Sequence, residues 1–474
     1  MNRTLVILAA ALTAFALGCE PQAQRTTPAW VNPLDLMEPN LPADPKDSNY
    51  VLARMEFGRL AILLGSYTRA RPRLREAFDQ LEVEHENVGA ALSSERLKYY
   101  KGETFERAML CTYSALAEYL AGNYNEARIL LSRALLADKG AVVEKSTPAE
   151  VGEDFGLAFY WIGKTYAKLG DMDNSAIAFR KATTRTPRKD AERESKEDAK
   201  AAGEMLKKRT EGEAWVYKTF HNPEKPDLYI DPIVNLAEAE GTPRGDAGTP
   251  ADAPAVLQGA APASPVRRSV DKPEEFFTPA FQTATNLVLT LDLGRCPYKY
   301  LGGISGEKTE FGRSPVCPRA VRVYIDGHYA GPAFQVLDLW DQASTQDRIG
   351  EKEAAQTTKA VLREVLSYAP YAGSMASHWD VSGDIRHWTT LPGKVFVFAA
   401  DVAPGPHTVR LEMYDINGSR LPRWTNTYYG IGVPKTGEAY VSLAPWFDGD
   451  NRLGPDDVRK AMNAGANPAS TYGF

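Results

Sequence analysis

Two aspartates and two histidines between residues 378 and 387 come closest to acid–base chemistry. They are His378, Asp380, Asp384 and His387. A pair of carboxylates can hydrolyse a glycan or a peptide, one acting as acid and the other as base or nucleophile. A lone histidine beside tryptophan at the start of a strand is more often a structural hydrogen-bonding group. Because no catalytic motif surrounds the two aspartates, a cell-wall hydrolase is the remotest function considered, and no catalytic residue is predicted.

An acidic stretch near the C-terminus offers carboxylates that could bind a metal ion. Residues 447–458 resemble the later part of an EF-hand loop, which would put Asp448, Asp450 and Asp457 at calcium-ligand positions. However, Trp446 stands at the first ligand position, where the loop needs an oxygen donor. We therefore favour an acidic loop and a short surface helix, with calcium as the alternative. The six histidines show no zinc-ligand spacing, and no metal or other cofactor is predicted.

Three of the four cysteines have structural interpretations. Cys111 lies in a helical apolar pattern and is expected to be a small core residue. Cys296 and Cys317 flank a glycine-rich loop in one predicted β region, and we expect them to form a disulfide. Closing a loop of this size would stabilise the fold by about 3 kcal/mol.

Cys19 carries different chemistry. Residues 1–18 have the pattern of a signal peptide, and their apolar run is shorter than the ~20 residues that span a bilayer. The sequence Ala16-Leu17-Gly18-Cys19 resembles the lipobox of bacterial lipoproteins, although leucine followed by a small residue is the commoner order. The resemblance implies cleavage before Cys19 and acylation of that residue. Glu20 in the next position implies the outer membrane, facing the periplasm.

Length and charge set outer limits on structure and partners. With 474 residues the chain exceeds the usual size of one core, so more than one domain is expected. A net charge of −6 without a basic stripe argues against nucleic acid as a partner. No small-molecule substrate is predicted.

Small and aromatic residues recur at similar spacing in three helical segments. In the clearest one they are Phe159, Ile162, Gly163, Tyr166, Gly170, Ser175, Phe179, Ala182 and Pro187. This spacing resembles the tetratricopeptide repeat (TPR), in which small residues let two antiparallel helices pack closely and a turn glycine adopts positive φ. The turn glycines Gly65, Gly122 and Gly170 are 57 and 48 residues apart, against a regular period of 34, so extra segments separate the units.

Beyond an Ala/Pro/Gly-rich stretch the apolar period changes to two. The alternating segments are 287–293, 320–327, 394–402, 407–415 and 439–443. Residues 351–369 have a helical pattern that ends before Pro370. The sequence therefore predicts an antiparallel β-sandwich-like domain with a helical insertion.

A wider resemblance covers most of the chain. The stretch LKYYKGETFERAMLCTYSALAEYLAGNYNEARI is similar to a block of bacterial TPR-containing lipoproteins of uncharacterised function. DIRHWTTLPGKVFVF and APGPHTVRLEMYD are similar to elements of their C-terminal β region. The resemblance implies fold and compartment, and it supplies no activity.

These observations predict an α+β multidomain protein. Its expected parts are a signal peptide (1–18), a tether (19–46), a TPR-like helical domain (47–214), a connecting segment (215–239), an Ala/Pro/Gly-rich linker (240–272), the β-sandwich-like domain (273–446) and an acidic C-terminal loop with a short helix (447–474).

We expect a non-catalytic scaffold or adaptor, anchored by lipid in the cell envelope, that binds a protein partner through its TPR-like helices. The predicted partner-binding groove consists of Met55, Arg59, Thr112, Leu116, Tyr119, Tyr160 and Lys164. An alternative is an accessory subunit of a cell-wall synthesis, secretion or flagellar machine that docks through the β domain.

Overall fold

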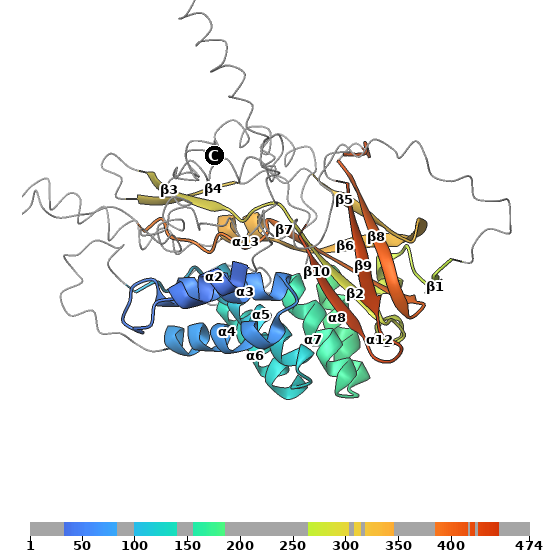
Figure 1. Cartoon of the computed structure of the whole chain (residues 1–474), viewed down its shortest axis with the longest axis horizontal. Coiled ribbons are helices and arrows are strands. Elements are labelled where there is room, and N and C mark those ends of the chain that lie inside the picture. Colours follow the sequence, from blue (N-terminus) through green and yellow to red (C-terminus); the bar gives the residue numbers. More distant parts are fainter. Residues whose placement is uncertain are drawn as a thin grey trace, which may run out of the picture. The chain divides into compact units, whose positions relative to one another are not determined.

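The computed structural model describes nine stretches of the chain. They are residues 33–82, 99–139, 155–184, 264–302, 308–313, 318–345, 384–415, 418–421 and 425–444. Six longer helices and one large sheet dominate these residues, and Figure 1 shows the helices in a layer along the strands. No helix within the described stretches has the length and apolar character to cross a membrane.

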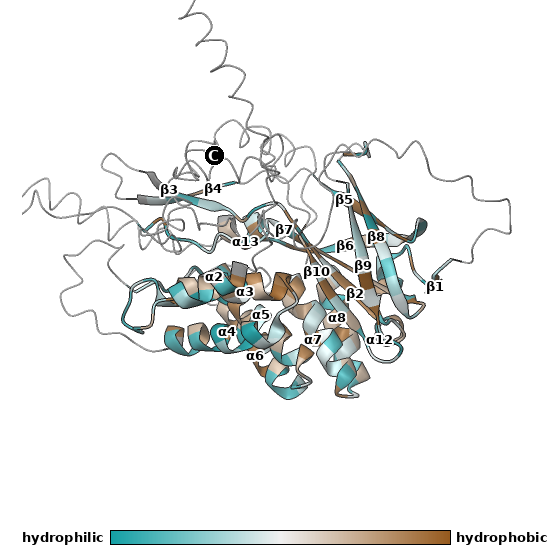
Figure 2. Ribbon diagram, in the orientation of Figure 1, coloured by the Kyte–Doolittle hydropathy of each residue, from teal (hydrophilic) through white to brown (hydrophobic). Residues whose placement is uncertain are grey.

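The longer helices form three antiparallel hairpins. The pairs are α3 (Tyr50–Leu63) with α4 (Tyr67–Glu82), α5 (Thr104–Leu120) with α6 (Tyr124–Lys139), and α7 (Gly156–Lys168) with α8 (Met172–Thr184). Figure 2 shows many hydrophilic residues on the second helices α4 and α6. The first helices α3, α5 and α7 are almost wholly buried. The hairpins therefore present their first helices to the rest of the chain.

Glycines fix the geometry of each hairpin as the repeat pattern predicts. Gly65, Gly122 and Gly170 sit in the turns with φ values of 67°, 82° and 81°, where other residues would be strained. Inside the third hairpin, a Cβ added to Gly163 would come within 2.7 Å of the Phe179 ring. The expectation that small residues allow close helix packing is therefore confirmed.

Shorter elements accompany the hairpins and connect the strands. They are α2 (Pro33–Met37), the 3-10 helix η1 (Glu38–Asn40), α11 (Pro273–Phe276), α12 (Pro279–Thr283), α13 (Leu339–Thr345) and the hairpin of β3 (Tyr298–Gly302) and β4 (Lys308–Gly312).

The remaining strands belong to one sheet with the order β10-β2-β7-β6-β5-β8-β9. Their bounds are β2 (Leu287–Leu293), β5 (Ala320–Ile325), β6 (His328–Asp338), β7 (Lys394–Val402), β8 (Gly405–Tyr414), β9 (Asn426–Val433) and β10 (Ala439–Leu443). The sheet curls until β9 and β10 come into contact, so that it is nearly closed. A further short strand, β1 (Val266–Arg268), pairs with β7 and lies inside the segment that the sequence predicts as linker.

Two details differ from the predicted sandwich. Apart from the separate β3–β4 hairpin, the described strands form one continuous sheet, and β10 runs parallel to β2, whereas every other described pair is antiparallel. The predicted helix 351–369 lies outside the described residues.

Two separate cores pack against the sheet, one inside its curl and one on the outer side of β2, β6 and β7. One core lies inside the curled sheet and is made of side chains such as Leu289, Val323 and Leu411. The other joins Val288, Val397 and their neighbours to the inner faces of the helical hairpins. The helical and strand-rich regions therefore share a core, and their contact surface is part of the folded chain.

Candidate functional site at the helix–strand interface

The predicted groove residues lie on the first helices of the three hairpins, as the repeat pattern implies. Met55 and Arg59 are on α3, the next three are on α5, and Tyr160 and Lys164 are on α7. All seven residues, which are Met55, Arg59, Thr112, Leu116, Tyr119, Tyr160 and Lys164, are at most 5% exposed. The chain's own C-terminal region covers this face. A separate partner could reach these residues only by displacing it.

Glu438, directly before β10, is bound by two of the hairpins. The Lys164 ammonium forms an ion pair with Glu438, and the Tyr119 hydroxyl donates a hydrogen bond of 3.3 Å to the same carboxylate. Burial lowers the pKa of Lys164, although the Glu438 charge opposes this shift. The pKa of Tyr119 is raised, first by burial and then by the neighbouring Glu438 charge. Its hydroxyl therefore stays protonated and serves as a donor.

Helix α7, which binds Glu438 through Lys164, also binds Gln282 on α12. The Tyr160 hydroxyl donates to its side-chain oxygen at 3.1 Å, and Lys164 donates to its backbone carbonyl at 3.3 Å. Lys164 therefore connects two segments that lie far apart in the sequence, and α7 positions both.

Tyr440, within β10, continues the contact along the hairpins. Its backbone carbonyl accepts a hydrogen bond of 3.2 Å from Tyr67, and its ring lies 5.5 Å from that of Trp161, centroid to centroid. On the sheet side, the Tyr440 hydroxyl is 2.8 Å from the Thr290 hydroxyl. An extended segment with a carboxylate and an aromatic ring thus occupies the inner face of the hairpins.

A buried ion pair joins α3 to the sheet. The Arg59 guanidinium pairs with Asp292 on β2, and both side chains are buried. The guanidinium also lies 4.6 Å from the centroid of the Tyr113 ring. Removing one partner of such a pair leaves an uncompensated charge and typically costs about 3–5 kcal/mol. This contact therefore restricts how far the sheet can move from the helices.

Backbone N–H groups of a second segment, residues 384–391, dock on carboxylates of the first helices. Glu56 accepts hydrogen bonds from the amides of Thr389 and Thr390 at 2.6 and 3.1 Å, and Glu106 accepts one from the amide of Trp388 at 2.6 Å. Burial raises the pKa of Glu56 to about 7, although these hydrogen bonds oppose the shift. The helical layer therefore holds this segment through its main chain.

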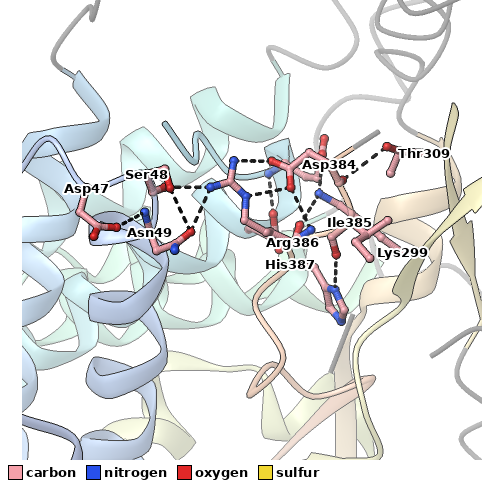
Figure 3. Close-up of polar contacts among 11 residues, drawn as sticks. Asp47, Ser48, Asn49, Lys299, Thr309, Asp384, Ile385, Arg386 and His387 are labelled. Atoms are coloured by element: carbon pink, nitrogen blue, oxygen red, sulfur yellow. Dashed lines mark hydrogen bonds and ion pairs between the residues drawn. The ribbon is translucent and has the colours of Figure 1, made fainter. Parts of the chain in front are cut away.

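Figure 3 shows how Arg386 fixes the start of this segment. Its guanidinium donates to both carboxylate oxygens of Asp384 at 2.8 and 2.7 Å and to the Ser48 carbonyl at 2.9 Å. Lys299 donates to the Arg386 carbonyl at 2.9 Å. Asp384, one of the two acid–base candidates, is thus a structural partner of Arg386.

The histidine of the acid–base stretch also has a structural position. His387 is buried, and its Nδ1 lies 3.0 Å from the Ile385 carbonyl oxygen. His378 and Asp380 lie outside the described residues. Among the residues that are described, no three histidine, cysteine, aspartate or glutamate side chains gather as a metal site would require.

The other predicted sites lie partly or wholly outside the described stretches. Cys19, Cys317 and the calcium candidates Asp448, Asp450 and Asp457 all fall there. Cys296 is buried, and its sulfur lies 3.2 Å from the Trp388 carbonyl oxygen, beside the docked segment. Its pairing with Cys317 stays a prediction. Cys111 is buried in α5, as expected of a core residue.

Residues 157–189 match the family model of the tetratricopeptide repeat. The match covers nearly all of α7 and the whole of α8, and it confirms the repeat predicted from the glycine and aromatic spacing. Repeats of this kind build surfaces that bind other polypeptides, which fits a protein-interaction scaffold. No curated protein and no solved structure matches the chain.

The sequence analysis did not identify the carboxylates through which the helices and the docked segments bind each other. Glu56 and Glu106 are buried on helices whose neighbours are mainly apolar. A charged residue inside such a run needs a buried partner, and this was the available signal. Glu438 had no comparable signal because it stands in a loop with a glycine and a proline nearby.

Proposed function

We propose that this chain is a non-catalytic scaffold or adaptor of the bacterial cell envelope, held to the outer membrane through lipid on Cys19. The TPR-type hairpins are the observation that carries the proposal, because such hairpins bind polypeptide segments. Here the inner face already binds extended segments through buried carboxylates, lysine and tyrosine. The lipid anchor is supported by the lipobox-like sequence before Cys19.

The occupied inner face changes how the scaffold would work. Because the chain's own strands cover the inner face, the second helices and the outward face of strands β5 and β8 remain as surfaces for a separate protein. A variant proposal, in which the chain is an accessory subunit of an envelope machine that docks through its β region, agrees with this arrangement.

The anchor and the partner are tested separately. For the anchor, cells fed an alkyne fatty acid should label the wild-type protein, and Cys19→Ser should abolish the label. For the partner, a photo-crosslinking amino acid replaces the exposed Ile129 of α6 or Tyr329 of β6 in living bacteria, and buried Phe57 serves as the control position. An unlabelled wild-type protein would refute the anchor. Absence of any protein adduct from both exposed positions would refute the scaffold.

A further inference from the structure

The outward face of strands β5 and β8 carries a group of arginines and tyrosines. Val321, Val323 and Ile325 of β5 point into the core inside the curled sheet. Because side chains alternate along a strand, Arg322 and Tyr324 point outward. The same alternation on β8 turns Arg410 and Tyr414 to this outer side.

We call the set of Arg322, Tyr324, Tyr329, Arg410, Tyr414 and Arg420 the Arg–Tyr face. Neighbouring strands place its members against one another. The Arg322 guanidinium lies 4.8 Å from the Tyr414 ring centroid, and that of Arg410 lies 4.3 Å from the Tyr324 centroid. Tyr329 packs edge-on against Tyr324 with ring centroids 5.6 Å apart. These stacked side chains are held in place before any partner binds, which lowers the entropy that binding costs.

The face remains accessible in the folded chain. The side chain of Arg420 is 48% exposed and Tyr329 is 47% exposed, and Arg322 is also exposed. Arginine and tyrosine are the residue types that most often dominate protein–protein binding energy. A pre-ordered and exposed group of both types is therefore suited to a protein partner.

The charge of the face indicates the chemistry of that partner. It contains three guanidinium groups, and two carboxylates among the described residues contact it. These are Glu412, whose side chain is 8% exposed, and Asp271, which accepts a hydrogen bond of 2.9 Å from the Tyr329 hydroxyl. Glu412 accepts from Arg410 at 2.5 Å and from the Tyr414 hydroxyl at 3.0 Å, and Arg420 lies 3.3 Å away. Burial alone would raise the pKa of Glu412, but these partners lower it overall, so the carboxylate stays charged. Three guanidinium groups against two carboxylates give the face a positive balance on a chain whose net charge is −6.

We propose that the Arg–Tyr face is the partner-binding surface of the scaffold and that it binds an acidic, extended segment of another protein. Guanidinium forks bind carboxylates through two parallel hydrogen bonds, and tyrosine rings add apolar contact. This inference rests on the proposed scaffold function. The competing explanation is that the same pairs only stabilise the sheet from strand to strand.

A binding assay on the full chain separates these explanations. The probe is a fluorescein-labelled peptide of ten glutamates, and binding is followed by fluorescence anisotropy. Arg322→Glu with Arg420→Glu should weaken binding by about tenfold or more. The matched control, Lys46→Glu with Lys435→Glu, changes the net charge equally at exposed positions off the face and should leave the affinity nearly unchanged. Tyr329→Ser keeps every charge and should weaken binding several-fold.

Three results would overturn the proposal. The first is that the peptide does not bind the wild-type chain, and the second is that the face and control variants lose equal affinity. The third is that an acidic oligosaccharide (alginate) binds in place of the peptide. If the far-UV circular dichroism spectrum of the double variant differs from that of the wild type, the variant is misfolded. Arg322→Gln then replaces it in the same assay. Crosslinks in cells from Ile129 but not from Tyr329 would refute the Arg–Tyr face while leaving the scaffold function in place.

Discussion

Replacing Glu56 with glutamine should remove a pH dependence of folding stability that this buried carboxylate creates. Burial raises the pKa of Glu56 from 4.5 to about 7 in the folded chain. The folded state therefore binds more protons than the unfolded state between these values. The stability that Glu56 contributes is fully present below pH 4.5 and is lost as pH rises towards 7.

The magnitude follows from the size of the pKa shift. One pKa unit corresponds to about 1.4 kcal/mol, so the wild-type chain should lose roughly 2 to 3 kcal/mol through Glu56 between pH 5 and pH 8. Glu56→Gln has no proton to lose. It also turns an amide N–H group towards a docked backbone N–H group. At every pH this makes the variant about 1–3 kcal/mol less stable than a wild-type chain in which Glu56 is protonated. The variant should thus be less stable than the wild type at pH 5 and close to it, or more stable, at pH 8.

Urea unfolding of both proteins at pH 5 and pH 8 provides the measurement. The quantity of interest is the variant's stability relative to the wild type, compared between the two pH values. Glu126→Gln, on the half-exposed side chain of a second helix, is the control and should show no such change. A relative change below about 0.5 kcal/mol for Glu56→Gln would refute the reasoning.

Three further predictions concern the helical layer. Gly163→Ala forces a Cβ against Phe179 and should lower the free energy of unfolding by about 1–3 kcal/mol, measured in urea. Lys164→Met and Glu438→Gln should each destabilise the chain more than the double variant does, because each single change leaves a buried polar partner behind; additive single effects in a double-mutant cycle would contradict this. Gly122→Ala, at a φ of 82°, should lower the melting temperature by about 1–2 °C, corresponding to about 1 kcal/mol, and an unchanged melting curve would count against the turn assignment.

Local patterns predicted the three helical hairpins and five of the ten strands that the structure describes. The strands 287–293, 394–402 and 439–443 match β2, β7 and β10 to the residue, because each is a short and mainly apolar run bounded by turn residues. The strand β9 was missed because two glycines, Gly430 and Gly432, interrupt its apolar pattern. Hairpin positions followed from turn glycines whose conformation few other residues can adopt.

Long-range contacts could not be obtained from such patterns. Lys164 and Glu438 are 274 positions apart, and neither residue's neighbours indicate the other. The spacing did place the groove residues correctly on the first helices, but it could not show what lies against them. The parallel pairing of β10 with β2 is of the same kind, since register between distant strands depends on the whole fold.

The late position of Glu438 and β10 in the sequence has a consequence for biosynthesis. The chain emerges from its N-terminus onward, so Lys164 appears 274 positions before Glu438. Until then the hairpins lack the strand that neutralises Lys164 and covers Trp161. A chain that ends before residue 438 would expose the charged and aromatic inner surface of the hairpins. Such truncated chains should be preferred clients of chaperones and proteases, while full-length chains escape both.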